Sequence, residues 1–319
     1  MKKIGILFGM ENSFPTALIQ RINSMNKGCL AEAVHISQVL QGMQNDYHVI
    51  VDRISHDVPF YRAYLKTAAL AGTAVLNNPF WNSADEKFFN NSLAHHLHIP
   101  VPKTALLPSF QRPPDTGPTS FRNLSYPMDW QEIFNYTGFP AYLKPFSGGG
   151  WKHVYRIETE NQFFETYGQT HQLVMMLQEE ILFDAYFRCY VIGGKQVHTM
   201  HYDPRLPHAE RYHAHYDVDK RLLKTVAQYA VTLNEYLGYD VNSVEFAVKD
   251  GIPYAIDFCN PVPDADLQSV GASNFEWIVN TTAEFAIEKA LVHAPGKDNL
   301  TWGKYMQHAV LQQPLRGEI

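Results

Sequence analysis

The chain has 319 residues, of which 45% are hydrophobic and 18% are charged, so it has enough apolar material for two or three domains. Its formal net charge of −6 gives no basic footprint for nucleic acid or an anionic membrane, although a few local cations could still hold an anionic ligand. The three cysteines lack CxxC spacing, so neither a disulfide framework nor a structural zinc site is expected. No stretch approaches the roughly 20 apolar residues of a membrane span, and we expect a cytoplasmic protein.

The first hundred residues alternate between apolar runs and amphipathic segments. The expected elements are strands over 3–9, 47–51 and 73–76 and helices over 14–22 and 31–40. Continuous apolar strands alternating with helices are typical of a parallel sheet that is covered on both faces. We therefore expect a small doubly wound domain, although it lacks the GxGxxG fingerprint of dinucleotide binding.

A domain boundary is expected after this region. Ser83 and Glu86 have the spacing of a capping box at the start of a helix, with Lys87 in its first turn. Pro100 and Pro102 end that helix and extend the chain. Most of the prolines lie in 105–140, so about 25 residues are expected to form a surface loop before a short helix begins at Trp130.

A glycine-rich hairpin follows. A short strand over 141–144 contains Lys144, Ser147-Gly148-Gly149-Gly150 forms a flexible loop, and a strand over 154–157 returns. Glycines let the backbone approach a ligand and direct its N–H groups toward phosphate oxygens, and the preceding lysine supplies positive charge. Many hairpins also turn on glycine without binding anything, so the run alone is weak evidence.

Polar residues end the next buried strand. The strand over 173–177 is followed by Gln178, Glu179, Glu180 and Ile181, whose backbone could border an adenine ring, although a helix start would look similar. A second strand is expected over 187–192, and a helix over 219–237 has an apolar stripe typical of core packing.

A hairpin with acidic residues lies near the C-terminus. Apolar and polar residues alternate over 243–248 and 253–258 around the turn Lys249-Asp250-Gly251. Glu245, Asp257 and Asn260 would then lie close together, and their oxygens suit a hard cation such as Mg²⁺. The alternative is a surface hairpin whose acids face water. A final helix is expected over 275–290.

Four segments occur in an order that resembles the ATP-grasp superfamily, which includes glutathione synthetases, D-alanine:D-alanine ligases and ribosomal-protein glutamate ligases. They are Lys87 with PVPKT, then YLKPFSGGG, then LQEEI with FRCYVIGG, and finally VEF with AIDFCNP. The resemblance covers roughly 80–265. It implies an ATP-grasp fold of the α/β and α+β classes, with an N-terminal Rossmann-like domain over 1–100 and grasp subdomains over 101–185 and 186–319. In the family, the nucleotide lies between the two grasp subdomains.

The resemblance also implies roles for individual residues. The phosphates of ATP would be reached by Lys87 and Lys144, and the mobile loop would consist of Ser147, Gly148, Gly149 and Gly150. The adenine would be bordered by Gln178, Glu179, Glu180 and Ile181, and the ribose would be met by Asp184. The ligands of Mg²⁺ (or Mn²⁺) would be Glu245, Asp257 and Asn260. The family commonly has the second acid and the asparagine two residues apart, whereas Asp257 and Asn260 are three apart. Either a β-bulge at Phe258 and Cys259 restores the common face, or Asp264 or Asp266 replaces one ligand.

Histidines and arginines are concentrated over 198–215. His213 and His215 would lie on one face of a strand and could bind a transition metal, although the spacing fits no established motif. The resemblance favours another interpretation, in which Arg211, or alternatively Arg205, neutralises the terminal phosphate and the developing acyl phosphate. Arg211 and Lys144 are thus the candidate catalytic residues.

The expected activity is that of an ADP-forming ligase, which joins a carboxylate to an amine through an acyl phosphate. Its partners would be ATP and a small-molecule, amino-acid or peptide substrate, without nucleic acid or membrane. A nucleotide-binding protein without ligase activity and a kinase on the same fold remain as alternatives. A homodimer is the default expectation for the oligomeric state.

Overall fold

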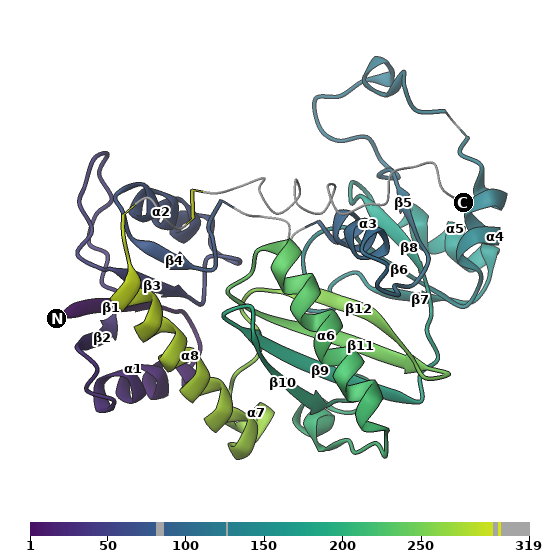
Figure 1. Ribbon diagram of the computed structural model, residues 1–319. Coiled ribbons are helices and arrows are strands. Elements are labelled where there is room, and N and C mark those ends of the chain that lie inside the picture. Colours follow the sequence, from purple (N-terminus) through teal and green to yellow (C-terminus); the bar gives the residue numbers. More distant parts are fainter. Residues whose placement is uncertain (81–85, 126, 296–298, 301–319) are drawn as a thin grey trace, which may run out of the picture. The chain divides into compact units, whose positions relative to one another are not determined.

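The computed structural model describes residues 1–80, 86–125, 127–295 and 299–300 (Figure 1). They form two compact units. The first contains residues 1–80, 185–246 and the described residues after 256, and the second contains the described residues of 86–184 together with 247–256. The hairpin of 241–260 therefore contributes its ends to the first unit and its tip to the second.

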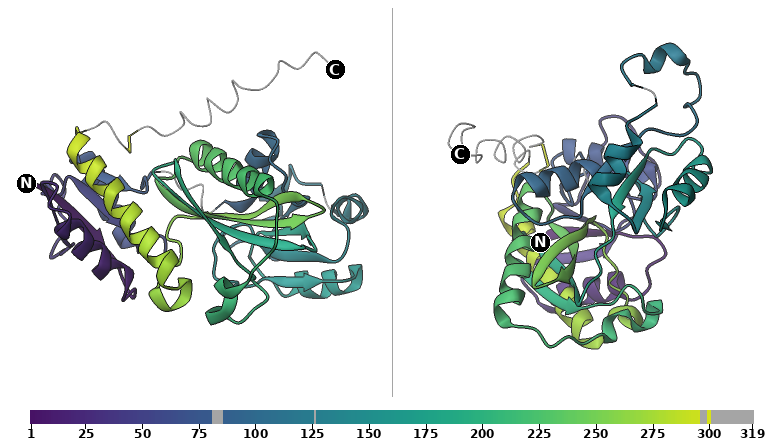
Figure 2. Two further views of the ribbon diagram at one scale, coloured as in Figure 1. Left: turned by 60° about the horizontal axis from the view of Figure 1, so that its bottom comes forward. Right: turned by 90° about the vertical axis from the view of Figure 1, so that its right-hand side faces the viewer.

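A four-stranded parallel sheet forms the N-terminal part of the first unit. Its strand order is β2 (Cys29–Ala33), β1 (Lys2–Leu7), β3 (Val49–Asp52) and β4 (Ala74–Leu76). Helices α1 (Phe14–Ser24) and α8 (Ala272–Val292) cover one face, and α2 (Pro59–Leu70) covers the other (Figure 2). Because both faces are covered, the strands are apolar along their length, as the sequence predicted for β1, β3 and β4.

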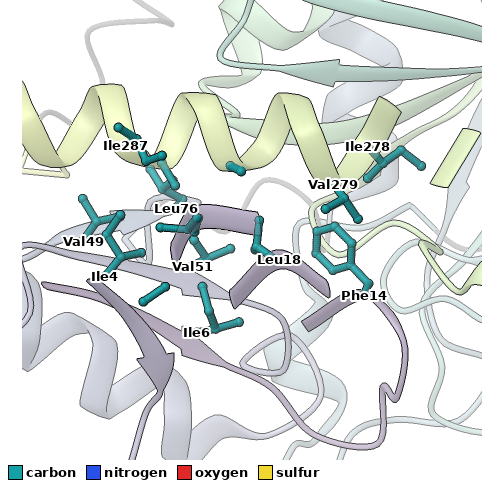
Figure 3. Close-up of a cluster of buried hydrophobic side chains, with 14 of the residues drawn as sticks. Ile4, Ile6, Phe14, Leu18, Val49, Val51, Leu76, Ile278, Val279 and Ile287 are labelled. Atoms are coloured by element: carbon teal, nitrogen blue, oxygen red, sulfur yellow. The ribbon is translucent and has the colours of Figure 1, made fainter. Parts of the chain in front are cut away.

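The core under α8 joins the N-terminal sheet to a helix that begins 196 positions after the last strand of that sheet (272 − 76) (Figure 3). Alternate strand residues such as Ile4 and Ile6 point to the same face, where they meet Leu18 of α1 and Ile287 of α8. Burying each such side chain is worth about 1.5–3 kcal/mol. Helix α8 therefore belongs to the N-terminal sheet domain, which the sequence did not indicate.

The predicted helix over 31–40 is wrong. Residues Cys29–Ala33 form β2, which pairs with β1 from Lys2↔Cys29 to Ile6↔Ala33, and no helix follows in 34–40. Cys29 and Ala31 are buried, whereas Leu30 and Glu32 are half-buried, which is the period of a strand. Alanine and glutamate favour helices in isolation, but pairing along the edge of β1 overrides that preference.

The second sheet of the chain includes the C-terminal hairpin. Its order is β10 (Gln196–His201), β9 (Ala185–Ile192), β11 (Val241–Lys249) and β12 (Ile252–Asn260). Helix α6 (Lys220–Leu237) lies along one face of this sheet (Figure 1, Figure 2). It begins at the N-cap Asp219 and ends at Gly238, and its predicted apolar stripe is buried at Val226, Ala230, Leu233 and Leu237. Two short helical segments, η3 (His208–His213) and α7 (Leu267–Val270), complete this part of the chain.

The hairpin between β11 and β12 confirms the predicted turn. Asp250 and Gly251 have φ of 52° and 74°, so both lie in the left-handed region. A two-residue turn of this kind matches the twist of the flanking strands and favours Asp-Gly. Since the turn fixes the pairing of the strands, it also fixes which residues of β12 lie opposite Glu245.

The second unit is built on an antiparallel sheet. Its order is β5 (Thr104–Leu107), β8 (Met175–Glu179), β6 (Ala141–Pro145) and β7 (Tyr155–Ile157). The helices of this unit are α3 (Lys87–His96), α4 (Trp130–Thr137) and α5 (Glu160–Gly168), with a 3₁₀ turn η2 (Pro118–Phe121) in the proline-rich segment. The predicted strand, loop and return strand around the glycines are confirmed. The predicted cap Ser83 lies outside the described residues.

Within the described ranges, no helix is both long enough and apolar enough to cross a lipid bilayer.

Candidate functional site

The two candidate phosphate-binding lysines come from adjoining backbone segments of the second unit. Lys87 is the first residue of α3, and its backbone N–H donates to the carbonyl of Phe146 at 2.7 Å. Phe146 follows β6, which contains Lys144. Both lysines are half-buried. The fold thus brings together the chain segments that carry these two cations, which are 57 positions apart in the sequence (144 − 87).

The glycine loop between β6 and β7 is open. Gly148 and Gly150 have φ of 89° and 68°, a conformation that L-residues rarely adopt. A Cβ atom added at Gly148, Gly149 or Gly150 would meet nothing within 4 Å. The glycines therefore serve backbone conformation here rather than close packing.

Gln178 has a structural role inside the second unit. Its side chain is buried, and Nε2 donates to Oγ1 of Thr104 at 2.8 Å and to Oδ1 of Asn91 at 3.3 Å. These bonds link β8 to β5 and α3. The neighbouring Glu179 exchanges hydrogen bonds with Lys103, whose N–H lies 3.2 Å from the Glu179 carboxylate.

Glu180 is held by two side chains of the same sheet. Nε and Nη2 of Arg156 each donate to its carboxylate at 2.9 Å, and the Tyr142 hydroxyl donates at 3.2 Å. The Arg156 hydrogen bonds hold the pKa of Glu180 below its ordinary value. Residues 180–184 are not helical, so the helix-start alternative is wrong.

Ile181 is buried and Asp184 is exposed. The carboxylate of Asp184 accepts from the N–H of Asp250 at 3.2 Å, and its own N–H donates to Val248 at 2.8 Å. Asp184 therefore supports the turn between β11 and β12.

In the first unit, Glu245 and Asp257 act on the same phenol. The hydroxyl of Tyr186 on β9 donates to the Glu245 carboxylate at 2.7 Å. Burial raises the pKa of Tyr186 well above its ordinary value, and the negative charges of both Glu245 and Asp257 raise it further. The alternative of acids that simply face water does not fit Glu245, whose side chain is only 14% exposed.

Arg188 is a functional candidate that the sequence reasoning missed. Its buried guanidinium lies 3.6 Å from the Glu245 carboxylate and donates to the Tyr212 hydroxyl at 2.9 Å. It also lies over the ring of Tyr202, 5.3 Å from the centroid. An arginine inside the otherwise apolar strand Ala185–Ile192 was the available signal, because a buried charge needs a partner.

The chain after β12 is anchored by hydrogen bonds. Asn260 donates from Nδ2 to the Ser243 carbonyl at 3.2 Å. Asp266 caps α7 and accepts from the Ser13 hydroxyl at 2.8 Å, and Asp264 accepts from the Asp266 N–H at 3.1 Å and from Ser269. Both aspartates thus have local partners of their own, whereas Asn260 lies at the end of the strand that carries Asp257.

Arg211 lies in η3 and is joined to the same group of tyrosines. Its Nε donates to the Leu206 carbonyl at 3.1 Å, and Nη1 donates to the Tyr202 hydroxyl at 3.4 Å. Tyr202 therefore contacts both Arg211 and Arg188. Arg205 instead forms a bidentate pair with Asp203, whose pKa these hydrogen bonds lower.

The expected strand over His213 and His215 is wrong, because His213 ends η3 and His215 lies in irregular chain. The imidazole of His215 stacks on His201 at 5.0 Å. Among the described residues, no group of three or more histidine, cysteine, aspartate or glutamate side chains has the arrangement of a metal site.

A second missed feature is the pair of the buried Arg53 and the half-buried Glu11, which follow β3 and β1. Nε of Arg53 donates to the Glu11 carboxylate at 2.9 Å, and Nη2 donates to the Pro263 carbonyl at 2.7 Å. In open α/β sheets, ligands commonly bind beyond the carboxyl ends of the strands. The sequence signal was an acidic and a basic residue directly after two buried strands.

Comparison with known structures identifies the fold. The chain aligns with a RimK-domain ATP-grasp protein from Sphaerobacter thermophilus at 17% identity and a TM-score of 0.62, over 89% of this chain and 99% of that one. It aligns with the D-alanine–D-alanine ligase from Bacillus anthracis complexed with ATP at 16% identity and a TM-score of 0.61, over 91% and 98%. The macrocyclase MdnC from Microcystis aeruginosa, bound with its precursor peptide MdnA, aligns at 16% identity and 0.60, over 90% and 100%.

No protein-family model matches the sequence, and neither does any curated protein. The fold is nevertheless clear: the chain has the ATP-grasp fold, with an N-terminal parallel sheet and two further antiparallel sheets. The expectation from the order of the sequence motifs is confirmed at this level.

Proposed function

We propose that the protein is an ATP-dependent, ADP-forming ligase that joins a carboxylate to an amine. The ATP-grasp fold, shared over about nine-tenths of the chain with ATP-dependent ligases, supports this proposal. The observation that carries it is the largely buried carboxylate of Glu245, which accepts from the Tyr186 hydroxyl at 2.7 Å and lies on the strand paired with the one that carries Asp257, because carboxylates of neighbouring strands can hold a divalent cation.

The donor set fits Mg²⁺ or Mn²⁺. Glu245 and Asp257 supply carboxylate oxygens, and Asn260 supplies an amide oxygen, since its Nδ2 already donates to the Ser243 carbonyl. Hard cations prefer such oxygens and complete their coordination with water and phosphate. When bound, the cation would neutralise negative charge that develops on the phosphates.

Lys87 and Lys144 are proposed to bind the phosphates of ATP, and residues 147–150 to close over them. The backbone around Glu179–Ile181 would border the adenine, while Asp184 would meet the ribose. Because the Glu180 side chain is already paired with Arg156, backbone groups rather than this carboxylate would contact the base.

The chemistry overcomes the poor electrophilicity of a carboxylate. A substrate carboxylate oxygen attacks the terminal phosphorus of ATP, the bond to the bridging oxygen breaks, and ADP leaves. An amine then attacks the acyl carbon, phosphate departs, and the nitrogen loses a proton to solvent. Arg211 and Lys144 are proposed to stabilise the charge that builds up on the transferring phosphoryl group.

An amino acid or peptide is the proposed substrate class. The aligned proteins include a D-alanine–D-alanine ligase and a macrocyclase bound with a precursor peptide. A cytoplasmic location is proposed as well, since Cys29, Cys189 and Cys259 are not joined in disulfides.

The irregular spacing of Asp257 and Asn260 favours one rival, a protein that binds the nucleotide without ligating anything. A kinase on the same fold is the other. Hydroxylamine separates all three functions, because it intercepts an acyl phosphate as a hydroxamate. The protein is incubated with MgATP, hydroxylamine and pools of amino acids and peptides, and ADP and hydroxamate are measured.

Ligase chemistry predicts that ADP and hydroxamate form together, and that Asp257→Asn abolishes both. The exposed Glu284→Gln on α8 serves as a matched control that keeps them. ADP with a phosphorylated hydroxyl and no hydroxamate would establish a kinase. Nucleotide binding without ADP release across the pools would establish the non-catalytic rival.

A further inference from the structure

The side chain of Asn242 occupies an unusual place in the second sheet. It is fully buried in β11, and its Nδ2 donates to the Phe258 carbonyl at 2.8 Å. Its Oδ1 accepts from the N–H of Asn260, also at 2.8 Å. One carboxamide therefore bonds the two backbone groups that flank Cys259 on β12.

In a regular antiparallel pair, backbone groups bond to backbone groups of the facing strand. A carboxamide carries a donor and an acceptor, as a peptide group does, so it can replace a backbone partner where one strand holds an extra residue. Residues three apart on a regular strand point to opposite faces. An extra residue at Phe258 or Cys259 brings Asp257 and Asn260 to the same face.

We propose that Asn242 is a positioning residue for the metal site. Its amide holds the irregular stretch of β12, so that the side-chain oxygen of Asn260 lies with the carboxylates of Glu245 and Asp257. This inference rests on the proposed function and explains how the chain accommodates a three-residue spacing between two metal ligands.

A second asparagine restrains the same region from outside the sheet. Oδ1 of Asn77, which follows β4, accepts from the N–H groups of Asp240 and Val241 at 2.7 Å each. Its Nδ2 donates to the carbonyls of Val241 at 2.7 Å and Pro261 at 3.0 Å. Asn77 therefore links Val241, which precedes Asn242, to Pro261, which follows Asn260. Within the stretch that these bonds restrain, the Asn242 amide bonds the backbone of Phe258 and Asn260.

The competing interpretation is that Asn242 only satisfies buried backbone groups. Leaving such groups unpaired is destabilising, so removal of the amide lowers stability under either interpretation. Only a positioning role also changes the affinity for the cation. Second-sphere partners of metal ligands typically contribute about 10- to 100-fold in affinity.

The test measures free Mn²⁺ by electron paramagnetic resonance during titration of the full chain in the presence of ADP. We expect Asn242→Ala to bind Mn²⁺ about 10- to 100-fold more weakly than the wild type. Asn234→Ala is the control, because Asn234 is another buried asparagine of the first unit but donates to Ala230 within α6. It should retain wild-type Mn²⁺ affinity while losing stability.

Asn242→Ser provides a milder variant should the alanine variant fail to fold. Hydrogen–deuterium exchange of the peptide over 255–265 should be faster in either variant, since the Asn260 N–H loses its acceptor. Folded Asn242 variants that bind Mn²⁺ as tightly as the wild type would overturn the inference alone. A wild-type protein that binds no Mn²⁺ with nucleotide would overturn the proposed function as well.

Discussion

Tyr186 of β9 and Glu245 of β11 are joined by a hydrogen bond of 2.7 Å across two neighbouring strands. The phenol is buried and stays protonated at physiological pH, so it acts as a fixed donor to the carboxylate. Such a donor orients a metal-binding carboxylate in the way that outer partners of metal ligands commonly do.

Tyr186→Phe should therefore weaken Mn²⁺ binding by about 10-fold or more, because Glu245 loses the donor that orients it. The ring and its packing are retained. Tyr190→Phe is the matched control, since Tyr190 is also buried on β9 but donates to the Asp264 carbonyl. Equal Mn²⁺ affinities of the two variants, measured by electron paramagnetic resonance, would contradict an orienting role for Tyr186.

Lys144→Met should raise the dissociation constant for ATP by about 10-fold or more, because a charge-assisted contact to a phosphate contributes about 1.5–3 kcal/mol. Lys195→Met, at an exposed turn beside Gly194, should leave the constant unchanged. Fluorescence-monitored nucleotide titration measures both. Retention of wild-type affinity by the folded Lys144 variant would remove this lysine from the phosphate site.

Gly150→Ala should weaken ATP binding, whereas Gly149→Ala should not. Both positions have open space for a methyl group, but only Gly150 of the two has a left-handed φ, at which alanine costs about 1–2 kcal/mol. If the loop must keep this conformation to close, the dissociation constant for ATP rises about 5- to 30-fold. Identical titration curves for both variants would show that the loop conformation does not matter for binding.

Glu180→Gln should destabilise the protein near neutral pH and progressively less in acid. The folded-state pKa of Glu180 is depressed, chiefly by the Arg156 hydrogen bonds. Its contribution is therefore present above the unfolded pKa and is lost as pH falls through the folded pKa. Urea unfolding of both proteins from neutral pH to below pH about 4 should show the difference in unfolding free energy shrinking. If the difference in unfolding free energy stayed constant with pH, the ion pair of Glu180 and Arg156 would not contribute to the stability of the folded state.

Strongly patterned parts of the fold could be predicted from the sequence. The apolar runs that contain Ile4 and Val49, the stripe of α6 and the Asp250-Gly251 turn each have a local signal that tertiary packing does not change. The segment after Cys29 shows the limit of such signals, because the identity of β2 depends on pairing with β1, 27 positions earlier (29 − 2).

The residues of the candidate site also fall into two groups, those with a local signal in the sequence and those that depend on distant partners. Glu245 and Asp257 interrupt apolar strands, so they stand out as candidates from the sequence alone. Arg188, Tyr186 and Asn242 become functional candidates only through partners that are distant in the chain. The side chains of Gln178 and Glu180 are bonded within the second unit, which the sequence did not indicate, so only the backbone of this segment stays a candidate for the adenine.

The most direct test of the account is titration calorimetry of the purified protein with ATP, in the presence of Mg²⁺ and again after its removal with EDTA. We expect saturable binding of one nucleotide per chain. The affinity for ATP should fall strongly when Mg²⁺ is removed and in the Glu245→Gln variant. No detectable binding of ATP by the folded wild-type protein in the presence of Mg²⁺ would contradict it.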